Sequence, residues 1–282
     1  MVRVYNIKAG KTEEHMVPFK DVLRKIAESG ETSAFGAKPG ANILKDFLVG
    51  IVSKRTNLSN EIGFVRDYLE FQMSSTYFGY GRIGNKKPVI LVPGFTGGDW
   101  TLVDLHRWLD RMDYSPSFAG INFNIEYSGV LLDKLQRKLD DETDIWQRKA
   151  VLIGHSRGGM LSKLLSDRNP DKVEQVITLC SPLNSTFSFN QAVLAGLAIA
   201  AVYNIPKYGI RINEEFSLLN QLDKRSKVPL TSIRAKNDGV INKESCIRSD
   251  ATNIEINSTH LGSLVNVDAY KAIFGALKRN AS

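Results

Sequence analysis

The chain has 282 residues, of which 43% are hydrophobic and 24% are charged, and its formal net charge is +7. This length is enough for one large α/β domain or for a medium domain with an extension, and the composition is ordinary for a soluble globular protein. The positive charge mildly favours anionic partners such as acidic membranes. No dense basic tract with interleaved aromatic residues occurs, so we do not expect nucleic acid as a partner.

The sequence has no evident targeting or membrane-spanning segment. The first ten residues, MVRVYNIKAG, have no apolar core of signal-peptide length, and the longest apolar stretch, AVLAGLAIAAV at 192–202, is shorter than the roughly 20 residues needed to span a bilayer. Two cysteines, Cys180 and Cys246, give neither a disulfide framework nor a metal-ligand spacing. We therefore predict a cytoplasmic protein without a metal site, and we leave the oligomeric state open.

Residues 1–85 have the apolar spacing of helices and carry no catalytic motif. We interpret them as a helical N-terminal extension packed on a main domain formed by residues 86–282. An independent domain is the less favoured alternative. Three amphipathic helices are predicted in the extension, near residues 19–26, 44–51 and 62–69, the last with Ile62, Val65 and Leu69 on its apolar face.

From residue 86 onward, short apolar segments alternate with amphipathic ones, which predicts parallel strands joined by helical crossovers. The strands are nearly all apolar, as a sheet covered on both faces requires. We therefore predict an α/β fold with a doubly wound, mostly parallel sheet. Strands are expected at 86–92, 117–125, 149–154, 172–181, 229–235 and 252–258, and helices at 97–110, 128–143, 157–167 and 266–279.

One long interruption, residues 183–228, follows the strand predicted at 172–181 and contains the apolar stretch 192–202. By itself, the apolar stretch is compatible with a core helix or with a helix that contacts an apolar ligand or surface, and both alternatives stay open at this point.

A possible nucleophile lies between the strand at 149–154 and the helix that follows. Gly154 and Gly158 flank Ser156 in the pattern G-x-S-x-G, and this strand-to-helix context is the one in which the pattern forms a nucleophile elbow. The serine takes a strained backbone conformation there, and the glycines let strand and helix approach closely. The sequence therefore predicts Ser156 as a nucleophile at the carboxyl edge of the sheet.

A serine hydroxyl needs a histidine to accept its proton. The chain has four histidines. His15 lies in a polar N-terminal stretch, His106 lies inside a predicted helix, and the side chain of His155 should point away from the hydroxyl of its neighbour Ser156. His260 directly follows the last predicted strand, so it reaches the correct edge of the sheet and is the predicted base.

The histidine needs an acid to orient it, and Asp238 directly follows the strand at 229–235. The order Ser156, Asp238, His260 is the order that this kind of sheet uses. Asp223 and Asp250 compete for the role, but Asp223 precedes its strand and Asp250 lies late in the loop. We predict Asp238.

The last requirement is a pair of N–H donors for a developing oxyanion. One is predicted to be the backbone N–H of Arg157, at the start of the helix after the serine. The other is predicted to be the backbone N–H of Phe95, because Pro93 and Gly94 turn the chain after the first strand of the sheet. The hydroxyl of Thr96 is a further candidate.

Together, the segments PVILVPGF, GHSRGG, RAKNDGVI and STHLG resemble the α/β-hydrolase superfamily, and specifically its lipases and esterases, over residues 86–279. Residues 1–85 resemble no family that we can name. The resemblance implies ester hydrolysis through an acyl-enzyme on Ser156, without a cofactor, on an apolar ester or acyl substrate, with a lipid interface as a further candidate partner. This fold commonly places a cap at the position of residues 183–228, so the resemblance also implies that they form a helical cap insertion. Its apolar stretch at 192–202 is then expected to line an acyl pocket or to face lipid, which would favour medium-to-long acyl chains; a core helix is the open alternative. Thioesterases and acyltransferases share the same constellation and stay open, as does the less favoured possibility of a hydrolase-like binding protein.

Overall fold

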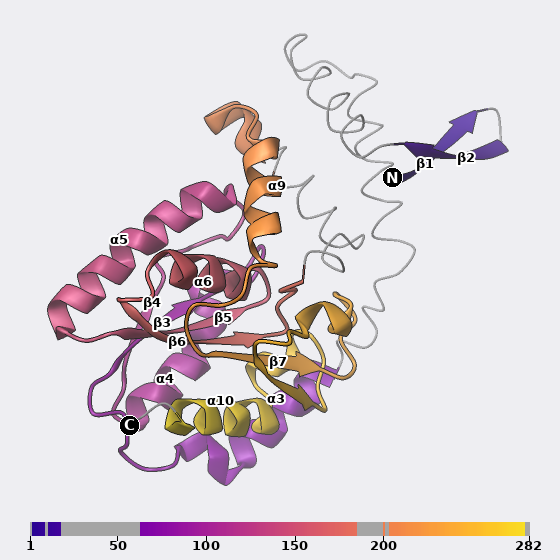
Figure 1. Ribbon diagram of the computed structural model, residues 1–282. Helices are drawn as coiled ribbons and strands as arrows, with labels where there is room; N and C mark the ends of the chain where they lie inside the picture. The colour runs from indigo at the N-terminus through magenta and orange to yellow at the C-terminus, as the bar shows by residue number, and fades with distance from the viewer. Residues whose placement is uncertain (1, 9–10, 18–62, 185–199, 201–202, 280–282) are drawn as a thin grey trace.

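The computed structural model describes residues 2–8, 11–17, 63–184, 200 and 203–279. Its main feature is a six-stranded sheet in the order β4-β3-β5-β6-β7-β8, in which all neighbouring strands are parallel (Figure 1). The predicted doubly wound parallel sheet is therefore confirmed. The strands are β3 (Pro88–Val92), β4 (Ser115–Phe118), β5 (Ala150–His155), β6 (Val173–Leu179), β7 (Leu230–Ala235) and β8 (Thr252–Ile256).

Helices cover both faces of this sheet, with α5 and α6 on one face and α3, α4 and α10 on the other (Figure 1). Side chains of β3 alternate between the two cores: Val89 and Leu91 pack with α4 and α10, whereas Ile90 and Val92 pack with α5 and α6. The central strands β3 and β5 are almost entirely apolar because both of their faces are buried, whereas the edge strands β4 and β8 contain polar residues and are partly exposed. The helices are α3 (Gly63–Met73), α4 (Val103–Arg111), α5 (Ser128–Trp146), α6 (Arg157–Arg168), α9 (Ile212–Gln221) and α10 (Val267–Arg279), with short 3-10 turns at 75–78, 99–102, 243–246 and 262–264.

The strand predicted at 117–125 is wrong in its extent, because β4 begins at Ser115 and ends at Phe118. Gly120 has a φ of 75°, which leaves the strand conformation. The backbone N–H groups of Gly120 and Ile121 then donate to Asp99 Oδ2, both at 3.0 Å, instead of to a neighbouring strand. A side-chain carboxylate thus takes over the hydrogen bonds that would have continued the sheet.

The N-terminal region contains a two-stranded antiparallel hairpin, β1 (Val2–Lys8) and β2 (Lys11–Val17), that the helical interpretation of residues 1–85 did not include. The helices predicted at 19–26 and 44–51 lie outside the described residues. The third exists as α3, but Leu69, which was predicted on its apolar face, is 55% exposed, whereas Asp67 and Phe71 are buried. The boundary between the extension and the main domain at residue 85 stays a prediction.

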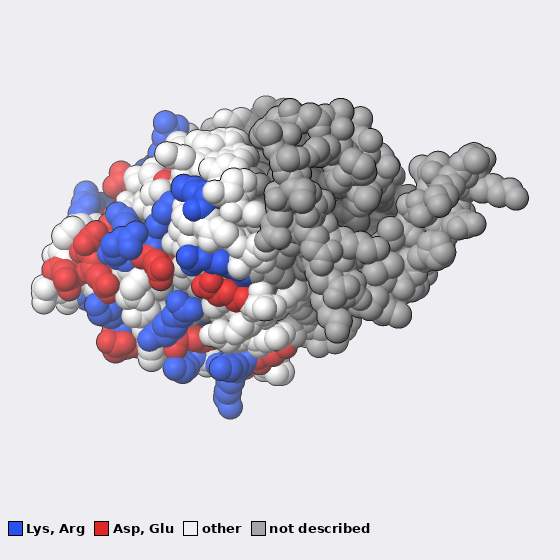
Figure 2. Space-filling view, turned by 90° about the horizontal axis from the view of Figure 1, so that it is seen from above, with Lys and Arg blue, Asp and Glu red and all other residues white. Residues whose placement is uncertain are grey.

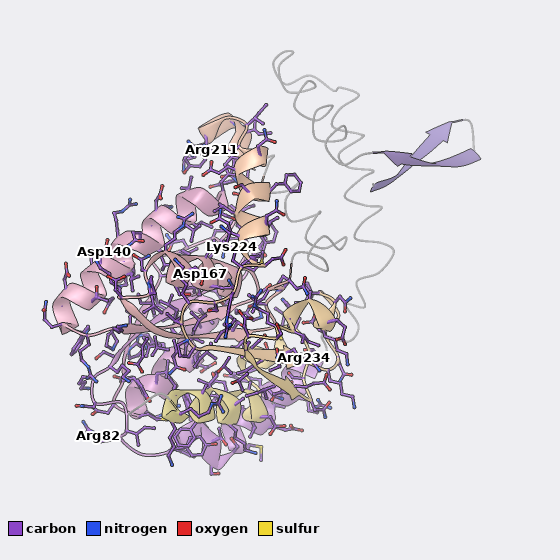
Figure 3. All side chains as sticks on the ribbon, in the orientation of Figure 1. Arg82, Asp140, Asp167, Arg211, Lys224 and Arg234 are labelled. Carbon is purple, nitrogen blue, oxygen red and sulfur yellow. The ribbon has the colours of Figure 1, made fainter. Side chains whose placement is uncertain are left out.

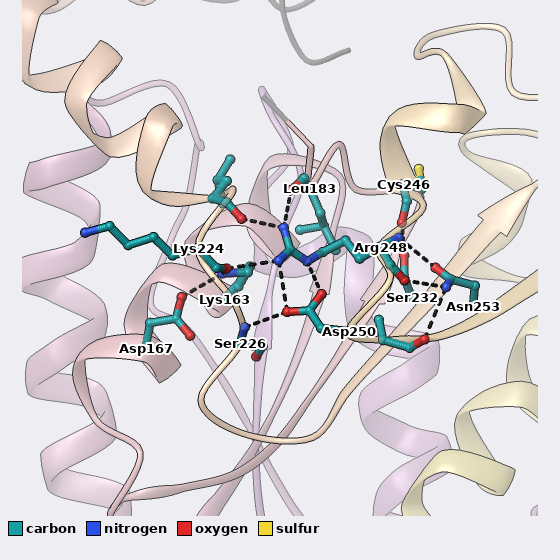
Figure 4. Close-up of polar contacts among 12 residues, drawn as sticks. Lys163, Asp167, Leu183, Lys224, Ser226, Ser232, Cys246, Arg248, Asp250 and Asn253 are labelled. Carbon is teal, nitrogen blue, oxygen red and sulfur yellow. Dashed lines mark hydrogen bonds and ion pairs between the residues drawn. The ribbon is translucent and has the colours of Figure 1, made fainter. Parts of the chain in front are cut away.

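Within the insertion at 183–228, the apolar stretch 192–202 lies outside the described residues except for Ala200, which is buried. The two ends of the insertion meet at Arg248 (Figure 4). The Arg248 guanidinium donates to the carbonyl oxygens of Leu183 at 3.0 Å and Leu222 at 2.6 Å, and Asp250 pairs with it at 2.7 Å. One guanidinium therefore holds Leu183 and Leu222 together, and the interpretation of residues 183–228 as a cap insertion stays a prediction.

Many charged side chains, such as the labelled Arg82, Asp140 and Arg234, lie around the outside of the layers (Figure 3). On the face seen in Figure 2, basic and acidic side chains are interspersed over the described residues. Elsewhere in the described part of the chain several charged side chains pair, such as Arg82 with Asp113 at 2.9 Å. Over the described ranges, every helix is too short or too polar to cross a bilayer.

Candidate active site

The order of the strands reverses at the carboxyl ends of β3 and β5. The chain leaves β3 toward β4 on one side and returns to β5 on the other, and ligands of open α/β sheets bind where the strand order reverses in this way. The loops after these two strands approach closely. A Cβ added to Gly94 would lie 2.7 Å from His155 Nδ1 and 3.2 Å from Ser156 Cβ. The glycine is thus needed for the two loops to meet.

Ser156 lies at the turn between β5 and α6 with φ 52° and ψ −123°, a backbone conformation that residues other than glycine rarely adopt. A Cβ added to Gly154 would lie 2.5 Å from the carbonyl of Gly158, so strand and helix touch through these two residues. α6 begins immediately after the serine, at Arg157. The serine side chain therefore lies at the positive end of a helix, on a backbone that is strained.

His260 and Asp238, from the loops after β8 and β7, form a hydrogen bond of 2.8 Å between Nδ1 and Oδ2. The other oxygen of Asp238, Oδ1, accepts from the backbone N–H groups of Val240 at 2.9 Å and Ile241 at 2.8 Å. The side chain of Asp238 is 1% exposed and that of His260 is 5% exposed. The carboxylate is thus held in one orientation, with one oxygen turned toward the imidazole.

The two competing acids have other partners or positions. Asp250 pairs with the Arg248 guanidinium through both oxygens, at 2.7 and 2.9 Å, and accepts from the Ser226 N–H at 2.7 Å (Figure 4). Burial alone would raise the pKa of Asp250, but these hydrogen bonds bring it down to about 2. Asp223 is exposed and lies just after α9. Neither arrangement supplies a carboxylate to His260.

His155 is a neighbour of the site that the sequence reasoning did not assign a role. It is buried, its ring lies 4.9 Å from that of His260, and its Nε2 lies 3.1 Å from the His260 carbonyl oxygen. Burial, and then the adjacent His260, lower the pKa of His155 to about 3, so the ring is neutral at pH 7. Because a carbonyl only accepts, Nε2 must carry the proton. The end of β5 is thereby tied directly to the His260 loop.

Asn124 organises the loop after β3, and no signal in the sequence marked it. It is fully buried and its side-chain N–H donates to the Pro93 carbonyl at 2.7 Å. Its backbone accepts from Thr96 N–H at 2.9 Å and donates to the Gly97 carbonyl at 2.8 Å. The Thr96 hydroxyl, a further candidate for the oxyanion, instead donates to the Phe95 carbonyl at 2.7 Å.

The Arg157 side chain links the same loop to the start of α5. Its guanidinium donates to Asn124 Oδ1 at 2.9 Å and to Ser128 Oγ at 3.1 Å, and lies 5.7 Å from the centre of the Phe95 ring. Within the described part of the chain, the backbone N–H groups of Phe95 and Arg157 have no acceptor, whereas those of Thr96 and Gly97 do. The two predicted donors are thus the ones left available.

One group of possible metal ligands occurs among the described residues: atoms of Cys180, Asp238 and His260 lie within 4.8 Å of one another. Burial, and then the charge of Asp238, raise the pKa of the Cys180 thiol well above its usual value, and a protonated thiol is a poor ligand. The facing atoms of Asp238 and His260 already bond to each other. The donor set therefore fits a hydrogen-bonded pair beside a buried thiol, and we assign no metal to it.

Comparisons with known proteins match the same region. Residues 145–264 match the model of the alpha/beta hydrolase fold. A stretch of 112 residues is 29% identical to "Putative methylesterase 14, chloroplastic" from Arabidopsis thaliana, covering 35% of this chain and only 30% of that relative.

Two solved structures are similar to this chain at low sequence identity. One, from the description of LipS and LipT, two metagenome-derived lipolytic enzymes, has a TM-score of 0.52 and 14% identity, and the match covers 71% of this chain and 96% of that one. The other, a monoacylglycerol lipase from Paleococcus ferrophilus, has a TM-score of 0.47 and 17% identity, with 71% and 97% covered. The sheet order, the turn at Ser156 and the family match at residues 145–264 confirm the resemblance seen in the sequence: this chain is an α/β-hydrolase-fold protein.

Proposed function

We propose that the protein is a serine hydrolase that cleaves carboxylic esters through an acyl-enzyme on Ser156. The observation that carries the proposal is the hydrogen bond of 2.8 Å between His260 and the buried Asp238, at the sheet edge where Ser156 occupies a strained turn. In a neutral histidine whose Nδ1–H donates to a carboxylate, Nε2 is unprotonated, and this tautomer can take a proton from a serine hydroxyl.

In the proposed reaction, Ser156 Oγ attacks the ester carbonyl carbon while its proton passes to His260 Nε2. The carbonyl oxygen becomes an oxyanion that accepts hydrogen bonds from the backbone N–H groups of Phe95 and Arg157, and Asp238 stabilises the imidazolium. The tetrahedral intermediate collapses, and the alcohol leaves with the proton from His260. Water then attacks the acyl-enzyme, with His260 again as base, and releases the acid and the free serine.

The availability of two N–H donors supports this assignment. Among the next residues along the loop, the Gly97 N–H donates to the Gly94 carbonyl and the Thr96 N–H donates to the Asn124 carbonyl. The Phe95 N–H has no acceptor among the described residues. The Arg157 N–H belongs to the first turn of α6, where backbone donors have no acceptor within the helix. Fixed donors of this kind contribute strongly to acyl transfer because they need no reorganisation as charge develops.

A fluorophosphonate probe tests the nucleophile. We expect the probe to label the wild-type protein once, on the peptide that carries Ser156, and to leave Ser156→Ala unlabelled. Ser217→Ala, which changes an exposed serine on α9, is the matched control and should be labelled like the wild type. Mass-spectrometric detection of the label at another serine, or an unlabelled but folded wild-type protein, would refute the assignment.

A substrate panel tests the class of ester. p-Nitrophenyl acetate, butyrate and octanoate vary the acyl chain, and each CH₂ that the protein buries in the transition state should add about 0.8 kcal/mol to its binding. Because the matched relative from Arabidopsis is called a methylesterase, methyl esters of small acids form a second arm. An acyl thioester and an added alcohol acceptor separate hydrolysis of oxygen esters from thioesterase and acyl-transfer activity. We expect hydrolysis of the p-nitrophenyl esters, rising with acyl length.

A further inference from the structure

Helix α3 is held in the core through one face. Phe71 is fully buried, with its ring 4.1 Å from that of Tyr270 on α10 and 5.4 Å from that of Tyr77. Asp67 precedes Phe71 by four residues, so both side chains project from the same face of the helix. The packing of Phe71 therefore fixes where the carboxylate of Asp67 lies.

Asp67 is a buried carboxylate, since its side chain is 1% exposed. Oδ2 accepts a hydrogen bond from Ser258 Oγ at 2.5 Å, and Oδ1 pairs with Arg66 at 3.1 Å, through an arginine side chain that is 59% exposed. Burying a carboxylate is costly unless its oxygens are bonded, and a largely exposed ion pair contributes little. The buried partner of Asp67 is thus the hydroxyl of Ser258, 191 residues further along the chain.

Ser258 belongs to the loop that carries His260. On the other side of the histidine, a Cβ added to Gly262 would lie 2.5 Å from Asp67 Oδ2 and 2.7 Å from Ser258 Oγ, so this residue has no room for a side chain. The Gly262 N–H donates to Thr259 Oγ1 at 3.0 Å, which closes the turn. The loop therefore wraps around the Asp67 carboxylate, with His260 between its two points of contact.

We propose that Asp67 is a positioning residue for His260 and that helix α3 thereby forms part of the support of the active site. The proposal rests on the proposed function, in which His260 is hydrogen-bonded to Asp238 through Nδ1 and takes the proton of Ser156 at Nε2. Asp238 bonds to the imidazole itself, whereas Asp67 accepts a hydrogen bond from Ser258, in the loop that carries His260. A displacement of about 1 Å in such a group can lower turnover about 10²-fold. The positioning residue lies outside residues 145–264, the part of the chain that matches the family model.

The test compares Asp67→Ala with Asp67→Asn, and uses Glu70→Ala as the matched control. Glu70 lies on the exposed side of the same helix and also pairs with Arg66, at 3.7 Å. We expect Asp67→Ala to lower kcat on p-nitrophenyl butyrate and the rate of fluorophosphonate labelling about 10- to 100-fold, with KM and the final labelled fraction nearly unchanged. Asp67→Asn keeps an acceptor for the Ser258 hydroxyl and should restore most of the rate.

A double-mutant cycle with Ser258→Ala separates a positioning role from a general loss of stability. If Asp67 acts through Ser258, the double variant should lose little more than Asp67→Ala alone. Losses that multiply, or a folded Asp67→Ala variant within about 3-fold of Glu70→Ala in kcat, would overturn the proposal.

A measurement that does not depend on turnover keeps this result distinct from a failure of the proposed function. The Nδ1 proton of His260, held by Asp238, should give a downfield ¹H NMR signal in the wild type. We expect this signal to weaken or exchange faster in Asp67→Ala and to persist in Glu70→Ala. An unchanged signal in Asp67→Ala contradicts the positioning role, whereas a wild-type protein that neither hydrolyses esters nor reacts at Ser156 contradicts the proposed function.

Discussion

Asp238→Asn is the substitution whose effect the structure defines best. The backbone N–H groups of Val240 and Ile241 both point at Oδ1, so the oxygen of an asparagine must take that position. Its NH₂ group is then forced toward Nδ1 of His260, where the carboxylate oxygen now accepts. A donor facing Nδ1 makes that nitrogen an acceptor and moves the imidazole proton to Nε2. In that tautomer, His260 cannot take the proton of Ser156.

The expected loss in kcat is about 10⁴-fold, the size found in serine hydrolases when this tautomer is imposed, which corresponds to about 5 kcal/mol of transition-state stabilisation. The geometry of the loop should survive, because asparagine has the shape of aspartate and keeps both bonds to Oδ1. The loss should therefore appear in kcat and in the rate of fluorophosphonate labelling, with KM and the melting temperature close to those of the wild type.

Two other substitutions serve as controls in the same assay. Asp223→Asn changes an exposed residue and Asp250→Asn changes the partner of Arg248, so neither should alter kcat per folded molecule by more than about 3-fold. A folded Asp238→Asn variant that keeps more than a tenth of the wild-type kcat would refute the tautomer argument. A crippling effect of Asp223→Asn would show that the acid had been misassigned.

Three further predictions follow from the contacts around the site. Asn124→Asp removes the donor to the Pro93 carbonyl, so kcat should fall about 10- to 100-fold. Asn122→Asp, which changes an exposed residue, should keep a kcat near that of the wild type, and equal kcat values for the two variants would contradict the role of Asn124 in positioning the loop after β3. The unfolded state binds a proton at His155 below about pH 6.5, and the folded state only below about pH 3, so this residue makes the protein less stable as the pH falls between these values. In urea unfolding, His155→Gln should weaken the dependence of the unfolding free energy on pH in this range, and an unchanged dependence would contradict a buried neutral ring. Asp250, with its pKa lowered from 3.8 to about 2, stabilises the fold above about pH 4, so Asp250→Asn should lower the melting temperature at pH 7, and the difference should shrink as the pH falls from 4 to 2.

The sequence alone determined the parallel sheet and the order of the candidate site residues. Strand side chains such as Val89 and Ile90 point to opposite faces, so an all-apolar segment between two amphipathic ones already predicts a strand covered on both sides. The carboxyl ends of parallel strands meet at one edge, so Ser156, Asp238 and His260, each directly after a strand, could be predicted to share that edge. These inferences depend on local periodicity and on chain order, both of which can be read without coordinates.

Only the tertiary structure decided which side chains support that edge. The apolar spacing of α3 favoured Leu69 for its buried face, yet the core takes Phe71 because Tyr270 and Tyr77 offer it a surface, and Asp67 is buried with it. The end of β4 depends on a carboxylate, that of Asp99, which is distant in sequence from the strand it stops. Polar side chains such as those of Asn124, His155 and Asp67 carry no periodic signal, since the partners to which they bond lie in segments that are distant in the sequence.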